Sequence, residues 1–124
     1  MGCCTDTGVI TNVMREVLKR CNSLILESNH STEMLAHGPY PEVLKRRIRS
    51  RVGHLSNEAA RHFLHELSGD LQTVILAHLS EVNNTPEKAL ASGREGLGLY
   101  YNDVPLHVAS MITHPACWEQ WIEI

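Results

Sequence analysis

The stretch TVILAHLSEVNN, residues 73–84, decides how the rest of the chain is organised. Its apolar, β-branched run at residues 74–77 predicts a strand buried on both faces, as in a sheet covered by helices. His78 then stands at the carboxyl end of that strand, where open α/β sheets place their ligands. A lone histidine in this setting is more often a hydrogen-bonded structural residue. A functional role for His78 therefore depends on partners at the same edge of the sheet.

The segments on either side predict an alternation of strands and helices. Short apolar runs at residues 2–5, 23–26 and 106–109 are typical of strands. Cap residues followed by apolar positions at helical spacing indicate helices between them, with the caps at Thr11, Ser56 and Thr85. The last of these helices should end near residue 92, because three glycines follow. Strands that flank single helices pair in parallel. The fold class is therefore α/β, with helices against a mostly parallel sheet.

A further helix, expected at residues 42–49, carries most of the local positive charge. We expect Val43, Leu44 and Ile48 to face inward. The basic residues should face solvent, either as an ordinary solvated surface or as a surface that follows the phosphates of a nucleic acid. They are Lys45, Arg46, Arg47, Arg49 and Arg51.

Composition narrows the class of protein without assigning an activity. The chain has 124 residues and a net charge of −3, which fits one domain or part of one. No apolar run approaches the length of a membrane span, and the start does not resemble a signal peptide. The four cysteines lack the spacing of a zinc knuckle, so we expect reduced thiols in a cytoplasmic protein.

Polar side chains follow three of the predicted strands. Asp6 follows the first strand, Glu27 begins a polar segment after the second, and His78 follows the third. Parallel neighbouring strands would bring these groups to one edge, where Asp and His supply ligands that zinc or manganese accepts. His54 lies in a loop just before a predicted helix, where an anionic group can be held.

Six motifs appear in an order that resembles a known family. The chain is similar to the C-terminal half of metallo-β-lactamase-fold hydrolases of the YycJ/WalJ type, and more distantly to tRNase Z and RNase J. The motifs are T-D-T-G at 5–8, L-E-S-N-H at 26–30, G-P-Y-P at 38–41, L-K-R-R-I at 44–48, G-H-L-S-N at 53–57 and L-A-H-L-S-E-x-N-N at 76–84.

The resemblance implies a role for each residue of the polar edge. Asp6 matches the aspartate that bridges two metal ions, and His78 matches the last histidine ligand of the second ion. His54 looks like the non-ligand histidine that contacts the scissile phosphate and protonates the leaving oxygen. Glu27 matches an acidic residue that orients such a histidine. Two divalent ions, zinc or manganese, about 3.5–4 Å apart would activate water and bind the displaced phosphate.

The chain also departs from the family pattern. The H-x-H-x-D-H motif, which supplies most of the ligands, is not in the sequence. We therefore expect residues 1–124 to be half of an αββα sandwich, and inactive alone. The parent domain would be a nuclease-like phosphodiesterase, and nucleic acid its partner. Two alternatives stay open: a non-catalytic interaction or oligomerisation module, and a metallohydrolase of small esters. Either a second copy or a complementing N-terminal half would then cover the exposed sheet.

Overall fold

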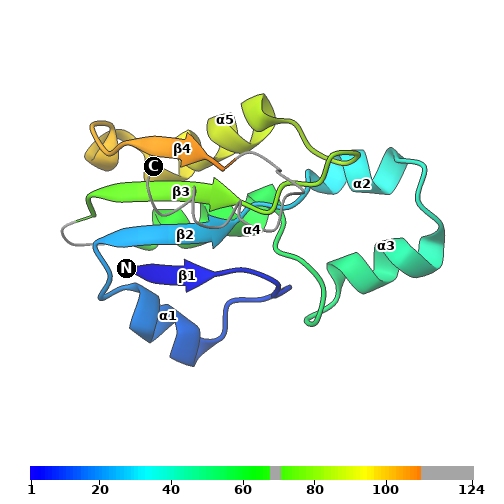
Figure 1. The fold of residues 1–124 in the computed structure, drawn as a ribbon, viewed down its shortest axis with the longest axis horizontal. Coiled ribbons are helices and arrows are strands. Elements are labelled where there is room, and N and C mark those ends of the chain that lie inside the picture. The colour runs from blue at the N-terminus through cyan, green and yellow to red at the C-terminus, as the bar shows by residue number, and fades with distance from the viewer. Residues whose placement is uncertain (68–70, 110–124) are drawn as a thin grey trace.

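The computed structural model of the chain describes residues 1–67 and 71–109. Its centre is a sheet of four parallel strands in the order β1-β2-β3-β4: β1 Gly2–Cys4, β2 Ser23–Glu27, β3 Thr73–Ala77 and β4 Leu106–Val108. The register places Glu27 beside Ala77, so β2 and β3 end side by side. Figure 1 shows that all four strands run in the same direction, which confirms the predicted α/β class and parallel pairing.

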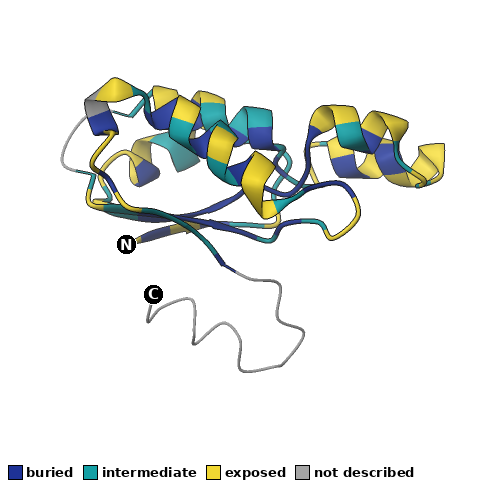
Figure 2. Ribbon diagram, turned by 90° about the horizontal axis from the view of Figure 1, so that it is seen from above, coloured by how far each residue is buried: buried dark blue, intermediate teal, exposed yellow. Residues whose placement is uncertain are grey.

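The main core lies between one face of the sheet and three helices, α1 Asn12–Leu18, α4 Asn57–His65 and α5 Pro86–Leu97. Figure 2 shows the helices of the chain on the same side of the sheet. Val74 and Leu76 point into this core, together with Leu24, Leu26 and Phe63. Burying each such side chain stabilises the fold by roughly 1.5–3 kcal/mol. Ile75 and Ala77 belong to a second cluster, so β3 is buried on both faces as predicted.

The predicted helix starts are confirmed by their capping bonds. The side chains of Thr11, Ser56 and Thr85 each accept a hydrogen bond from the backbone N–H three residues on. Such a cap contributes about 1 kcal/mol per helix.

The end of α5 differs from the prediction, because the helix continues through its glycines to Leu97. A Cβ at Gly93 would lie 3.0 Å from Leu76, and one at Gly96 would lie 2.6 Å from the backbone of Arg61. These glycines let α5 approach the sheet and α4 closely. They serve packing here, and the chain turns only at Gly98, where φ is +65°.

The segment between β2 and α4 also differs from the prediction. It contains α2 Thr32–His37, which the sequence reasoning missed, and α3 Glu42–Arg49. Both lie beyond the carboxyl edge of the sheet (Figure 1). Because α3 lies away from the main core, Val43 and Leu44 are exposed, and only Ile48 of the three predicted inward residues is buried.

Lys45 was expected on the solvent side and is instead buried. Its Nζ donates a hydrogen bond to the carbonyl oxygen of Ala36, at 2.9 Å. The sequence also predicts a final edge strand or a packed tail at residues 118–124, and these lie outside the described residues. Among the helices of the described residues, none has the length and apolar character that crossing a membrane requires.

Candidate metal centre

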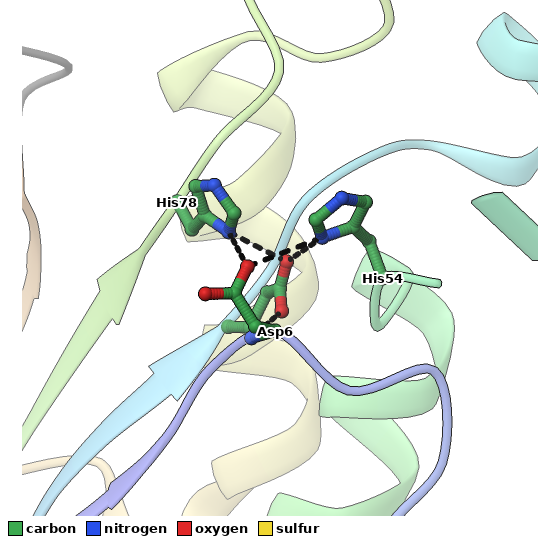
Figure 3. Close-up of side chains that lie close together, drawn as sticks. Asp6, His54 and His78 are labelled. Carbon is green, nitrogen blue, oxygen red and sulfur yellow. Dashed lines mark hydrogen bonds and ion pairs between the residues drawn. The ribbon is translucent and has the colours of Figure 1, made fainter. Parts of the chain in front are cut away.

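The carboxyl edge of the sheet brings together all four predicted site residues (Figure 3). Asp6 follows β1, Glu27 is the last residue of β2, and His78 follows β3. His54 comes from the loop between α3 and α4. One potential ligand atom from each residue lies within 4.8 Å of the others.

The carboxylate of Glu27 is the common acceptor of this cluster. His54 Nδ1 lies 2.8 Å and His78 Nδ1 lies 2.9 Å from the same oxygen, Oε2. The other oxygen, Oε1, accepts a hydrogen bond from the backbone N–H of Asp6 at 2.6 Å. Glu27 is fully buried, so no water competes for these contacts. It therefore holds three separate chain segments in one arrangement.

These hydrogen bonds orient the two imidazole rings. A carboxylate only accepts hydrogen bonds, so each Nδ1 donates to Glu27, and in the neutral form of either ring Nε2 is the nitrogen with the lone pair. The two rings meet edge to face, with centroids 4.9 Å apart. The hydrogen bond to Glu27 raises the pKa of His78, and burial opposes that shift.

The backbone is strained at two of the four residues. Asp6 and His78 both have φ of +58°, and they are the only non-glycine residues with positive φ in the described ranges. Such a conformation costs on the order of 1–3 kcal/mol and clusters at functional sites. At the end of β1 it directs the Asp6 backbone N–H to Glu27, and at the end of β3 it accompanies the contact of the His78 ring with Glu27.

Gly8 and Gly53 let the Asp6 turn and the His54 loop pack closely against the backbone at and just after the C-terminal end of α3. A Cβ at Gly8 would overlap the carbonyl oxygen of Ser50, and one at Gly53 would overlap that of Ile48. Gly8 N–H donates to the Arg51 carbonyl at 3.1 Å, and His54 N–H donates to the Ile48 carbonyl at 3.0 Å. The Asp6 turn and the His54 loop are therefore both bound to the C-terminal end of α3.

The donor set fits a divalent metal ion. The exposed carboxylate of Asp6 lies 3.3 Å from the half-buried ring of His78, measured from Oδ1 to Nδ1. Oxygen and imidazole donors suit zinc and manganese. A carboxylate behind the imidazole is the usual support for a metal-binding histidine. Within the described residues, Asp6 and His78 can supply ligands while Glu27 orients the ring.

A buried amide network behind the cluster escaped the sequence reasoning. Asn29 Nδ2 donates to the carbonyl oxygen of His78 at 2.8 Å, next to the strained peptide. Asn84 Nδ2 donates to the carbonyl oxygen of Ser28, and Asn57 Nδ2 donates to Asn84 Oδ1. All three asparagines are buried. The signal available in the sequence was that three of the six motifs contain an asparagine two to six residues after the site residue.

Comparison with known proteins finds relatives that are named exodeoxyribonucleases. The chain is 45% identical over 89 residues to an exodeoxyribonuclease YycJ of Bacillus anthracis, a match that covers 71% of this chain and 34% of the relative. The resemblance to the YycJ/WalJ type is confirmed. Two exodeoxyribonucleases WalJ of Streptococcus pneumoniae strains are 38% identical over 86 residues, covering 68% of this chain and 32% of the relative.

The chain thus spans about a third of the length of the curated relatives it matches. No protein-family model and no solved structure matches it.

Proposed function

We propose that this chain is the C-terminal part of a metal-dependent phosphodiesterase that hydrolyses DNA. The observation that carries the proposal is the convergence of Asp6, His54 and His78 on the buried carboxylate of Glu27. The relatives are named exodeoxyribonucleases, which supports nucleic acid as the substrate class.

Each residue has a distinct task in this proposal. Asp6 and His78 hold metal, and Glu27 orients both imidazoles through Oε2. His54 is 31% exposed and has its Nδ1 proton engaged by Glu27. Its Nε2 can therefore accept a proton and deliver it to the leaving oxygen, as a general acid requires.

The metal ions belong to the complete domain. When bound, divalent zinc or manganese supplies Lewis acidity for water activation and positive charge for the phosphate. We propose a two-ion centre to which Asp6 and His78 contribute, with the remaining ligands supplied by the H-x-H-x-D-H half that residues 1–124 lack. The chain alone should then bind metal weakly and should not turn over substrate.

A complementation assay tests this function. The chain is measured for exonuclease activity alone and joined to the N-terminal segment of the Bacillus anthracis relative, with Zn²⁺ or Mn²⁺. Activity should require the joined form and fall at least 100-fold in Asp6→Ala and His54→Ala. Asp103→Ala and His65→Ala, both at exposed positions, are the matched controls. Activity unchanged in the first two variants would refute the assigned roles. Cleavage of small esters with no action on DNA would favour the ester hydrolase.

A further inference from the structure

A cavity of about 350 Å³ opens directly beside the two histidines of the site. Its volume lies at the lower end of the range for small-molecule sites, which suits one nucleotide-sized group. Asn29, His54 and His78 line it at the site. The rest of the lining, its walls, comes from two other segments of the chain: Tyr40, Leu44 and Ile48 from one, and Leu79, Ser80, Glu81 and Val82 from the other.

The walls of the cavity are mainly apolar and partly open to solvent. Leu44 is 39% and Val82 is 43% exposed, although both are large hydrophobic side chains. Exposed apolar side chains that gather in a concave site indicate ligand contact rather than core packing.

Tyr40 gives this cavity an aromatic wall. It is partly buried, and its hydroxyl has no hydrogen bond within the described part of the chain. Pro39 and Pro41 flank it and restrict the backbone on both sides. The backbone of Tyr40 is therefore restricted, and its aromatic ring can stack against another planar ring.

Exposed basic side chains lie on α3 near the Leu44 side of the cavity, where positive charge attracts the phosphates of a polynucleotide. Arg47 follows Leu44 by three positions, so the two are neighbours on the surface of α3. Arg47, like Arg46, Arg49 and Arg51, is exposed, and none of these side chains forms an ion pair within residues 1–67 and 71–109. Lys45 does not belong to this group of exposed basic side chains, because its ammonium donates a hydrogen bond to a carbonyl at the end of α2.

Glu81 is the one acidic residue that lines the cavity. Its carboxylate repels a phosphate at that wall. The histidine end carries the carboxylates of Asp6 and Glu27 beside the two imidazoles, and under the proposed function bound metal ions offset their charge and hold the phosphate there. The uncharged part of the ligand then lies against Tyr40, Leu44 and Val82.

We propose that this cavity is a nucleobase subsite. The base of an unpaired nucleotide stacks on Tyr40 and packs between Leu44 and Val82, while its phosphate lies at His54 and His78. This inference rests on the proposed function and names the residues that contact the terminal base of the substrate.

Binding by the 124-residue chain tests the subsite without requiring catalysis. The probes are thymidine 5′-monophosphate, deoxyribose 5-phosphate and inorganic phosphate, followed by NMR titration. Tyr40→Ala should weaken the binding of thymidine 5′-monophosphate about 5- to 150-fold, which is the range expected when one stacked base loses its aromatic partner. It should leave the affinities for the two probes without a base unchanged. Tyr40→Phe should keep the wild-type affinity, since the ring remains.

Further variants keep the test decisive. Val82→Glu lies at a solvent-exposed position, so the chain should fold, and the added carboxylate should weaken the nucleotide at least 5-fold. Leu99→Ala is the matched control, because Leu99 is 91% exposed and does not line this cavity.

Equal affinity of wild type for all three probes would overturn the subsite, and so would equal affinities of Tyr40→Ala and wild type for the nucleotide. An inactive complementation assay with Tyr40-dependent nucleotide binding would refute the proposed hydrolysis and leave the subsite standing. If the joined protein is an active nuclease and Tyr40→Ala keeps the wild-type KM for single-stranded DNA, the subsite is refuted and the proposed hydrolysis stands.

Discussion

Replacing Glu27 by glutamine tests how the site is held together. The side chain keeps its size, but one carboxylate oxygen becomes an NH₂ group that only donates hydrogen bonds. Glu27 now accepts on both sides: Oε2 from the two imidazoles, and Oε1 from the Asp6 backbone N–H. A glutamine can accept on one side only, so Glu27→Gln must leave at least one donor facing an NH₂ group.

The expected cost follows from counting those donors. With the amide oxygen towards the imidazoles, only the Asp6 N–H loses its acceptor, at about 1–3 kcal/mol for an unsatisfied donor. With the amide reversed, both Nδ1–H groups would face the NH₂, and both rings would have to carry their proton on Nε2 instead. The first arrangement is cheaper, so we expect Glu27→Gln to lose about 1–3 kcal/mol of unfolding free energy.

Two measurements check this reasoning. Urea denaturation gives the free energy of unfolding, and ¹⁵N NMR of the imidazoles gives the protonated nitrogen of each ring. The control is Glu87→Gln, an exposed acidic position in the first turn of α5. A loss below about 0.5 kcal/mol in Glu27→Gln, with both rings unchanged, would show that Glu27 does not hold the site.

Three further changes have clear expected results. Gly8→Ala should displace the Asp6 turn, because its Cβ would overlap the backbone at the end of α3, and should cost about 1–3 kcal/mol by urea denaturation. Asn29→Ala removes the hydrogen bond to the His78 carbonyl, so zinc affinity, measured by calorimetry, should fall with little loss of helix signal by circular dichroism. Burial lowers the pKa of His30 below 6.5, so the unfolded chain binds that proton first, and stability should fall as the pH drops below 6.5. His30→Gln should flatten this dependence in pH-resolved denaturation, whereas His65→Gln, at an exposed position, should retain it.

The strands and their order of appearance could be predicted because each is a short, separate apolar run. β3 is the clearest case, since residues 74–77 are buried on both faces as their uniform apolarity implied. The ends of helices were less predictable. Gly93 and Gly96 looked like a loop because sequence alone does not show that Leu76 and Arg61 approach so closely.

The position of α3 was unpredictable for a related reason. Its pattern correctly indicated a helix, but the inward face depends on what lies opposite, and α3 lies off the edge of the sheet (Figure 1). Lys45 is buried because α2 ends beside it, and α2 itself was missed.

The sequence predicted which residues meet at the candidate site but not the hydrogen bonds between them. Parallel strands that end together place Asp6, Glu27 and His78 at one edge whatever the details of packing. That a single oxygen of Glu27 serves both imidazoles depends on side-chain geometry, which residue order does not encode.

The attachment of two loops to the end of α3 has a mechanical consequence. The Asp6 turn is bound through Gly8 to Arg51, and His54 is bound through its own N–H to Ile48. The opposite end of the same helix carries Leu44, in the wall of the cavity. A displacement of α3 would therefore shift the Asp6 turn and the His54 loop together. Under the proposed function, a ligand that displaces α3 through Leu44 would move the proposed metal ligand and the proposed proton donor at the same time.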